Sequence, residues 1–157
     1  ANGGHKIYPK IIVNDENKNE PIDKFEPLYK NSKNIRIIQD AMFGSTNEVM
    51  GTSYRSRIKD LKYQFAGKTG TAQVKKITER DRELDLKTFQ IPYEERDHAL
   101  YIAFGPYKNP RYALSVLVEH GGNGSTTAAP MAKKLFKLII DRHTLRESIN
   151  NKKDLEI

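Results

Sequence analysis

The sequence predicts an α+β fold in which an antiparallel sheet of about three core strands is packed by a C-terminal helix. Two apolar runs, 98–104 and 112–119, are separated by the glycine- and proline-containing segment 105–110, which is typical of a β-hairpin. A further strand is predicted at 63–77. Residues 128–143 carry apolar side chains at helical spacing, which predicts the covering helix.

The composition excludes several classes of protein. A chain of 157 residues with 37% hydrophobic and 30% charged residues is long enough for one domain and unlike a disordered polymer. No run of apolar residues is long enough to span a membrane. Cysteine is absent and the four histidines are scattered, so we expect no disulfide, no metal site and no cofactor. We interpret His98 as structural and not as a catalytic base, and His120 as a turn or surface residue.

The chain is basic, with a formal net charge of +7. Its positive residues are spread along the sequence, and no single element combines a basic stripe with interleaved aromatic residues. We therefore expect a solvated basic surface that favours anionic surroundings, and no nucleic-acid partner. A non-enzymatic basic binding module stays as an alternative, which salt-dependent binding of DNA would support.

The N-terminal part begins with a turn at Asn2-Gly3-Gly4. The apolar run 7–13 then predicts an extended segment, which Pro9 confines to the edge of a sheet because proline cannot donate to a strand ladder. Residues 14–33 are polar and charged and predict an exposed loop.

A first helix is predicted at 34–43. Either Ser32 or Asn34 can cap its start, and Gly44 is expected to end it. Its apolar residues recur at helical spacing: Ile35, Ile38, Ala41 and Met42. Residues 45–60 are polar and rich in turn-forming residues.

The central part alternates strands with connections. The connection 78–97 is strongly charged and long for a hairpin loop, which is typical of functional or mobile loops. Both faces of the strands 98–104 and 112–119 are apolar. We therefore expect both to be central strands that are covered on two sides.

The C-terminal helix is expected to follow the glycine-rich break at 121–124. Its N-cap candidates are Ser125, Thr126 and Thr127, and Pro130 suits its first turn. One predicted face carries Ala132, Leu135, Phe136 and Ile139, and the other carries Lys133, Lys134, Lys137 and Asp141. The domain is expected to span 1–143, and 144–157 is expected to be a polar tail.

The most informative stretch is 65–74, whose centre is Lys68-Thr69-Gly70. A phosphate-binding loop would need glycine at position 62, where the chain has Lys62, and a helix after the motif, where Thr71 to Val74 favour a strand. A strand that carries the tripeptide by chance is a second interpretation. The third is the Lys-Thr-Gly element of the serine acyl-transferases that react with penicillin.

The third interpretation assigns a task to each residue of the motif. Hydroxyls of Thr69 and Thr71 lie two residues apart on one face of a strand and can both donate to a substrate carboxylate. Gly70 leaves room for a ligand to lie against the strand. Lys68 attracts the carboxylate and favours proton transfer near a nucleophile. The Thr71 backbone N–H is placed to stabilise an oxyanion.

Ordered segments on both sides of the motif decide between these interpretations. They are 1–4 with Pro9 after it, 51–58, 66–74, 97–106, and 118–122 leading to 128–130. In this order they resemble the C-terminal part of the transpeptidase domain of class B penicillin-binding proteins, and most closely penicillin-binding protein 2. The resemblance covers about residues 1–143.

The resemblance also indicates what is missing. The family needs Ser-x-x-Lys, which holds the acylated serine, and Ser-x-Asn or Ser-x-Asp. Residues 56–59 and 45–47 match these strings by letter, but their order is reversed and their distance from Lys68 is far too short. We expect neither to be catalytic. The nucleophile is expected upstream of this chain, which then is a portion of a longer enzyme and inactive alone.

The family fold implied is a five-stranded antiparallel sheet with helices on both faces. The activity implied is serine-type D,D-transpeptidation of peptidoglycan stem peptides that end in D-Ala-D-Ala, inhibited by beta-lactams. The resemblance implies a periplasmic domain anchored in the inner membrane outside this chain. It also implies work with an elongation machinery that includes a membrane glycosyltransferase. A D,D-carboxypeptidase or beta-lactamase of the same fold is the alternative.

Overall fold

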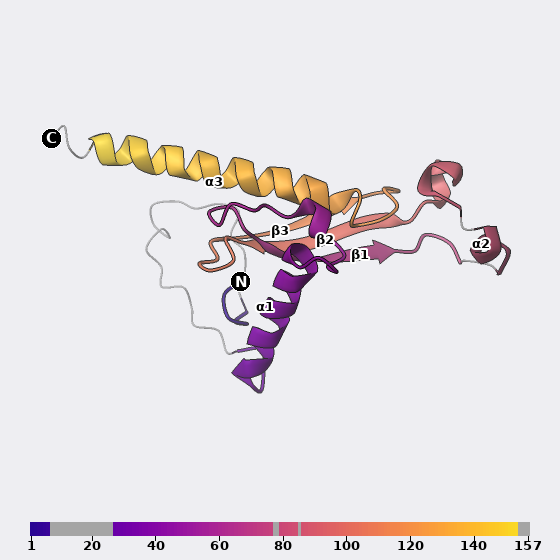
Figure 1. Cartoon of the computed structure of the whole chain (residues 1–157), viewed down its shortest axis with the longest axis horizontal. Helices are drawn as coiled ribbons and strands as arrows, with labels where there is room; N and C mark the ends of the chain where they lie inside the picture. The colour runs from indigo at the N-terminus through magenta and orange to yellow at the C-terminus, as the bar shows by residue number, and fades with distance from the viewer. Residues whose placement is uncertain (7–26, 77–78, 85, 154–157) are drawn as a thin grey trace.

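The fold is a small antiparallel sheet with a long helix over one face and a second helix against its first strand (Figure 1). The computed structural model describes residues 1–6, 27–76, 79–84 and 86–153. Its helices and strands are α1 (Ser32–Asn47), β1 (Ala66–Ala72), α2 (Glu79–Leu84), β2 (His98–Gly105), β3 (Tyr112–Val118) and α3 (Ala128–Lys153). Single 3-10 turns occur at Tyr54–Ser56, Thr88–Gln90 and Tyr93–Glu95. None of the helices in these ranges combines the length and apolarity that crossing a membrane requires.

The three strands form one antiparallel sheet in the order β1-β2-β3. This confirms the α+β prediction of about three strands and a C-terminal helix. The expectation that both hairpin strands are central is wrong for the described part of the chain. There β2 is central, whereas β3 forms an edge and one sheet face stays open, with Ile102 51% and Leu117 56% exposed.

The core lies between the sheet and α3. Phe65 and Phe136 stack with their ring centroids 4.9 Å apart, and both side chains are fully buried. Alternate residues of β2 face this core, because successive side chains of a strand point to opposite faces. Small residues let the helix approach closely: Ala99, Ala103, Ala128, Ala129 and Ala132 all belong to the core cluster.

A buried group of hydroxyls joins α1 and the segment after it to the sheet. Tyr101 in β2 is fully buried, and its hydroxyl lies 2.9 Å from Thr46 Oγ1 and 3.1 Å from Ser53 Oγ. Ser53 Oγ also donates to the Ser45 carbonyl at 3.0 Å. A Cβ at Gly67 would come within 2.3 Å of the Tyr101 hydroxyl oxygen. Glycine at position 67 is therefore a packing requirement of this cluster.

Helix α1 begins earlier than the predicted range 34–43. Its N-cap is Asn31, whose Oδ1 accepts a hydrogen bond from the Lys33 N–H at 2.9 Å. Neither of the predicted caps, Ser32 and Asn34, has this role, because both lie inside the helix. The asparagine is a favourable cap because its side chain satisfies one of the N–H groups that a helix start leaves unpaired.

The same helix continues past Gly44, which was expected to end it. Its last turn is held by a tertiary contact, since the Asn47 amide donates to the Phe65 carbonyl at 2.9 Å as well as to the Phe43 carbonyl of the same helix at 3.0 Å. A glycine inside a helix costs only about 1 kcal/mol. Contacts of this kind outweigh that cost, and the helix ends at Asn47.

The first strand is shorter, and the connection after it more structured, than the sequence suggests. β1 is shorter than the predicted 63–77, because beyond its end the Val74 N–H donates to Asp97 Oδ1 at 3.1 Å and not to a strand. The charged connection 78–97 contains α2 and two 3-10 turns. The extended run predicted at 7–13 lies outside the described residues.

Helix α3 starts as predicted but runs to Lys153, past its predicted end at about residue 143, so residues 144–153 continue the helix. On its predicted apolar face Ala132 and Phe136 are buried, whereas Leu135 is 41% exposed. Of the predicted caps, Thr127 Oγ1 donates back to the Gly121 carbonyl at 2.8 Å. This hydroxyl therefore fixes the preceding loop.

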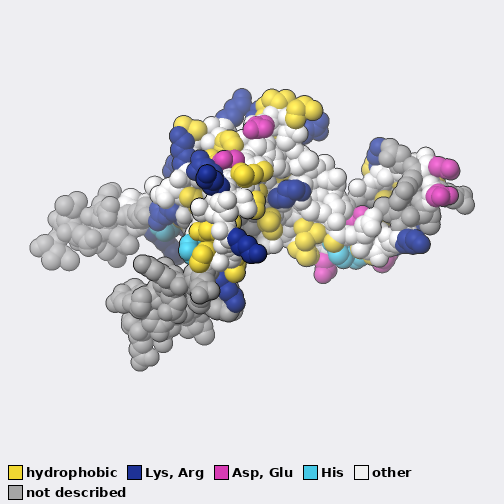
Figure 2. All heavy atoms as spheres, turned by 90° about the horizontal axis from the view of Figure 1, so that it is seen from below, with side chains coloured by type: hydrophobic (Ala, Val, Ile, Leu, Met, Phe, Trp, Pro, Cys, Tyr) yellow, Lys and Arg dark blue, Asp and Glu magenta, His cyan; other side chains and the backbone are white. Residues whose placement is uncertain are grey.

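The charges of the chain are unevenly distributed on the side opposite α3 (Figure 2). On this face the basic side chains lie over the body of the molecule, among exposed hydrophobic ones. The acidic side chains gather chiefly at the end that carries α2.

Replacing Tyr101 with phenylalanine tests the hydroxyl cluster. Tyr101→Phe is expected to lower the free energy of unfolding by about 1–2 kcal/mol, because two buried hydroxyls lose a partner. Urea denaturation measures the loss. Tyr93→Phe is the matched control, since Tyr93 is 55% exposed, and it should change stability by less than about 0.5 kcal/mol. Equal losses in the two variants would contradict the role given to the cluster.

Candidate active site

The Lys68-Thr69-Gly70 motif lies in the middle of β1, which forms one edge of the sheet in the described part of the chain. In the β1–β2 ladder Thr69 pairs with Tyr101 and Thr71 pairs with Ala99. Directly opposed residues of an antiparallel pair share a face. Thr69 and Thr71 therefore lie on the same face of the sheet, as the sequence predicts, and Lys68 starts on the other.

A pocket of about 470 Å³ opens along this strand. Its lining residues are Thr52, Lys68, Thr69, Gly70, Thr71, Asn123 and Ser125. The structure thus brings together all four residues that the sequence singles out. It adds three from two other segments, which sequence reasoning missed.

Thr52 is the first residue that was missed. Its hydroxyl lies 3.4 Å from Thr69 Oγ1 and 3.1 Å from Ser45 Oγ. The neighbouring Ser53 is buried in the Tyr101 cluster, which fixes the backbone that presents Thr52. The sequence analysis names the segment 51–58 only for its resemblance to a family segment. That resemblance was the signal, but it assigned no function to Thr52.

Asn123 and Ser125 come from the loop before α3, which packs at Gly124 against the backbone of β1 and β2. Asn123 Oδ1 accepts hydrogen bonds from the Ser125 N–H at 2.8 Å and from Ser125 Oγ at 2.7 Å. Between them, a Cβ at Gly124 would lie 2.5 Å from the carbonyl oxygens of Gly70 and Leu100. The loop can approach the strand this closely only because position 124 has no side chain.

The charge of the pocket suits an anion. Lys68 is exposed, and its ammonium donates to the Thr69 carbonyl at 2.7 Å. Among the described residues that line the pocket there is no carboxylate, whereas hydroxyls come from three threonines and a serine. An ammonium with several hydroxyl donors can hold a carboxylate through charge-assisted hydrogen bonds.

Neither of the two strings that match catalytic serine elements by letter lines this pocket, although Ser45 Oγ lies 3.1 Å from Oγ1 of the pocket residue Thr52. Ser56 is 2% exposed and lines a groove beside α3. Asn47 uses its amide to bind backbone carbonyls, as described above. Among the residues that the structure describes, no three histidine, aspartate or glutamate side chains are grouped to hold a metal ion.

His98, the first residue of β2, and His120, two residues after β3, contact each other and the backbone. The His120 N–H donates to His98 Nδ1 at 2.9 Å, and their ring centroids are 4.8 Å apart. His120 Nδ1 lies 3.1 Å from the Arg96 carbonyl, and its φ of 53° marks a tight reversal. These contacts fix the turn after β3.

Comparison with known proteins identifies the family. A family model described as the penicillin binding protein transpeptidase domain matches residues 1–137. The chain belongs to this family.

Two curated relatives are peptidoglycan D,D-transpeptidases named MrdA. The protein from Salmonella typhimurium strain LT2 is 32% identical over 149 residues, which is 89% of this chain and 23% of the relative. The protein from Haemophilus influenzae is 34% identical over 119 residues, which is 73% of this chain and 18% of the relative. The chain therefore spans less than a quarter of the length of these relatives.

Solved structures agree with the family. Penicillin-binding protein PBP2 of Helicobacter pylori, in complex with MreC, matches with a TM-score of 0.58 and 32% identity over 76% of this chain and 20% of that one. PBP2 of Pseudomonas aeruginosa, in complex with WCK 5153, matches with a TM-score of 0.55 and 28% identity over 76% of this chain and 22% of that one. The transpeptidase fold predicted from the sequence is thereby confirmed for this portion.

Two glycine substitutions test how the loop supports the strand. Gly124→Ala is expected to lower the free energy of unfolding by about 2 kcal/mol or more, because its Cβ would press on two carbonyl oxygens of the sheet. Gly70→Ala should change it by less than about 1 kcal/mol, since its Cβ would meet only Leu100 Cβ, at 3.3 Å. Thermal and urea unfolding give both values. A Gly124→Ala variant as stable as Gly70→Ala would contradict the close approach.

Proposed function

We propose that this chain forms the carboxylate-binding wall of a peptidoglycan D,D-transpeptidase whose acylated serine comes from a segment outside the chain. The observation that carries the proposal is the pocket that unites Lys68, Thr69, Gly70 and Thr71 on one strand edge. Membership of the transpeptidase family and the names of the relatives support it. No Ser-x-x-Lys serine lies in this pocket among the described residues.

The substrate is proposed to be a stem peptide that ends in D-Ala-D-Ala. Its terminal carboxylate accepts hydrogen bonds from the hydroxyls of Thr69 and Thr71, and the ammonium of Lys68 supplies the opposite charge. Thr52, 3.4 Å from Thr69, adds a further hydroxyl to the same side of the pocket. Gly70 leaves the strand accessible to the peptide backbone.

The chemistry is proposed to follow an acyl-enzyme route. The serine oxygen attacks the penultimate carbonyl carbon, the peptide bond breaks, and the terminal D-alanine leaves with a proton on its amine. The Thr71 N–H stabilises the oxyanion that forms on the carbonyl oxygen. An amine of a second stem peptide then attacks the ester, forms the cross-link and restores the serine hydroxyl. A beta-lactam acylates the same serine and is proposed to be an inhibitor.

The setting of the reaction is proposed from the relatives. The Helicobacter pylori PBP2 structure contains MreC as a partner, which supports assembly of this protein with a partner protein. We propose that this assembly is an elongation machinery that also includes a membrane glycosyltransferase. We place the domain on the periplasmic side of an inner membrane, with its anchor outside this chain. Transfer is favoured over hydrolysis because the curated relatives are named transpeptidases. Product analysis on stem peptides separates transfer from carboxypeptidase or beta-lactamase activity.

The 157-residue chain by itself is expected to be inert toward penicillin. Incubation with a fluorescent penicillin followed by denaturing electrophoresis should give no covalent band, because the described pocket lacks a nucleophilic serine element. A band that disappears in Ser56→Ala would show that residues 56–59 hold the nucleophile after all.

The proposed carboxylate-binding role is tested in the full-length protein that contains this chain. Thr71→Val should lower the second-order rate of acylation by penicillin about 10- to 100-fold, which corresponds to one lost hydrogen bond to a charged group. The matched control is Thr144→Val, whose hydroxyl donates to the Ile140 carbonyl within α3. Unchanged acylation in Thr71→Val, with normal acylation in the control, would overturn the proposed function.

A further inference from the structure

A second concavity lies between the segment 55–63 and the first half of α3. It has a volume of about 660 Å³ and shares Ser125 with the pocket beside β1. Four cationic side chains line it: Arg55, Lys133, Lys134 and Lys137. We refer to it as the α3 groove. Nothing in the proposed transpeptidase reaction uses it.

The positive charge of the α3 groove results from helical spacing. Counted from Pro130, the three lysines follow after three, four and seven positions: Lys133, Lys134 and Lys137. All four residues therefore occupy one face of α3. Arg55 approaches from the opposite wall. None of the four cations forms an ion pair within the described part of the chain.

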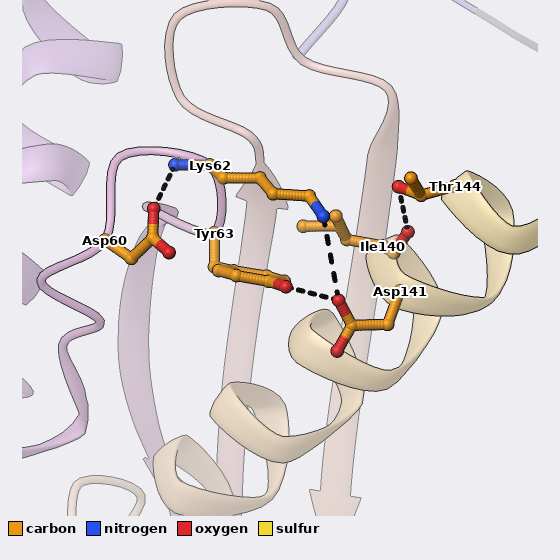
Figure 3. Close-up of polar contacts among 6 residues, drawn as sticks. All are labelled: Asp60, Lys62, Tyr63, Ile140, Asp141 and Thr144. Atoms are coloured by element: carbon orange, nitrogen blue, oxygen red, sulfur yellow. Dashed lines mark hydrogen bonds and ion pairs between the residues drawn. The ribbon is translucent and has the colours of Figure 1, made fainter.

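The acidic residues nearby do not neutralise these cations. Asp60 is the only described acid that lines the groove, and its Oδ1 accepts a hydrogen bond from the Lys62 N–H at 3.0 Å. Asp141, one turn beyond Lys137, is engaged by the Tyr63 hydroxyl and lies 3.8 Å from Lys62 Nζ (Figure 3). Positive charge therefore exceeds negative charge in the groove, which costs free energy until an anion arrives.

The contacts to Asp141 also give the groove a defined shape. Figure 3 shows the Tyr63 and Lys62 side chains reaching from the 60–63 turn to α3. The turn and the helix are thereby held at a fixed distance at this end. At the other end Ser125 is fixed through its two hydrogen bonds to Asn123.

A buried hydroxyl points to a ligand independently of the charges. Ser56 is 2% exposed, lines the groove and makes no side-chain hydrogen bond with any described residue. No fully buried side-chain polar atom lacks a partner in the described part, so this hydroxyl keeps a small exposed area, and the groove that Ser56 lines is where a ligand can reach it. A buried hydroxyl that keeps a free hydrogen-bonding capacity is uncommon unless a ligand or water completes it.

We propose that the α3 groove binds a phosphate or diphosphate group. Four cations and the hydroxyl of Ser56 supply more donors than the two oxygens of one carboxylate can accept. A phosphate monoester dianion or a diphosphate offers more acceptor oxygens and more charge. Arg55 can bind it through two nitrogens, and the lysines act as point charges.

The first experiment titrates the 157-residue chain with inorganic pyrophosphate and follows amide resonances by NMR at about 0.15 M salt. Saturable shifts are expected in residues 55–56 and 125–137. Citrate, which carries similar charge on carboxylates, is the comparison and should bind at least about tenfold more weakly. Absence of saturable binding, or citrate binding as tight as that of pyrophosphate, would overturn the proposal.

Variants locate the binding. The double change Lys133→Gln and Lys137→Gln should raise the dissociation constant roughly tenfold or more, and Ser56→Ala should raise it several-fold. Lys108→Gln, an exposed lysine in the β2–β3 turn, is the matched control and should leave the constant unchanged. An equal effect of Lys108→Gln would show that only the net charge matters and would refute the site.

Vesicles then distinguish the two sources of such a group. Phosphatidate vesicles present a phosphate monoester on a lipid. Binding that pyrophosphate displaces indicates a lipid-borne ligand, whereas pyrophosphate binding without vesicle binding indicates a soluble one. Both results support the groove. Vesicle binding that survives Lys133→Gln and Lys137→Gln, together with unaltered pyrophosphate affinity, would contradict it.

Discussion

The burial of one tyrosine hydroxyl determines how the segments of this structure fit together. Tyr101 lies in the central strand with no exposed surface, so its hydroxyl must find partners inside the protein. The hydroxyls of Thr46 and Ser53 provide them, and Gly67 provides the space. The end of α1, the segment after it and β1 are thus all placed relative to β2. Burial raises the pKa of the Tyr101 hydroxyl, although its two hydrogen bonds oppose this, so it stays a protonated donor at neutral pH.

The candidate site depends on this arrangement. Because Ser53 is held in the buried cluster, the preceding Thr52 is presented beside Thr69 at the strand edge. On the other side of the pocket, the close approach of Gly124 to the sheet fixes the positions of Asn123 and Ser125 relative to β1. The pocket is built from three segments, and two contacts outside it fix their positions: the Ser53–Tyr101 hydrogen bond and the packing of Gly124 on the sheet. The motif strand supplies the chemistry, and the buried contacts supply its position.

These contacts also explain which features the sequence predicts and which it does not. The strands of the hairpin and the core of α3 follow from local periodicity, and Lys68 to Thr71 are adjacent in the chain, so both were predicted. Local rules failed where tertiary contacts outweigh them. Gly44 does not end α1, because Asn47 binds the Phe65 carbonyl. Thr52, Asn123 and Ser125 reach the pocket through folding alone, and no local pattern distinguishes them.

The distribution of charge also depends on tertiary contacts, because the fold brings together charges that are far apart in the sequence. In the sequence the charges are scattered, and Lys133, Lys134 and Lys137 belong to the polar face of a helix that would be expected to meet solvent. The segment 55–63 instead lies across from that face, tied to it through Asp141. A face that would meet only solvent on an isolated helix thus becomes one wall of a groove, in which Lys133 is partly buried while Arg55, Lys134 and Lys137 stay exposed. Part of the net charge of +7 is concentrated in the groove only when the segment 55–63 packs beside α3.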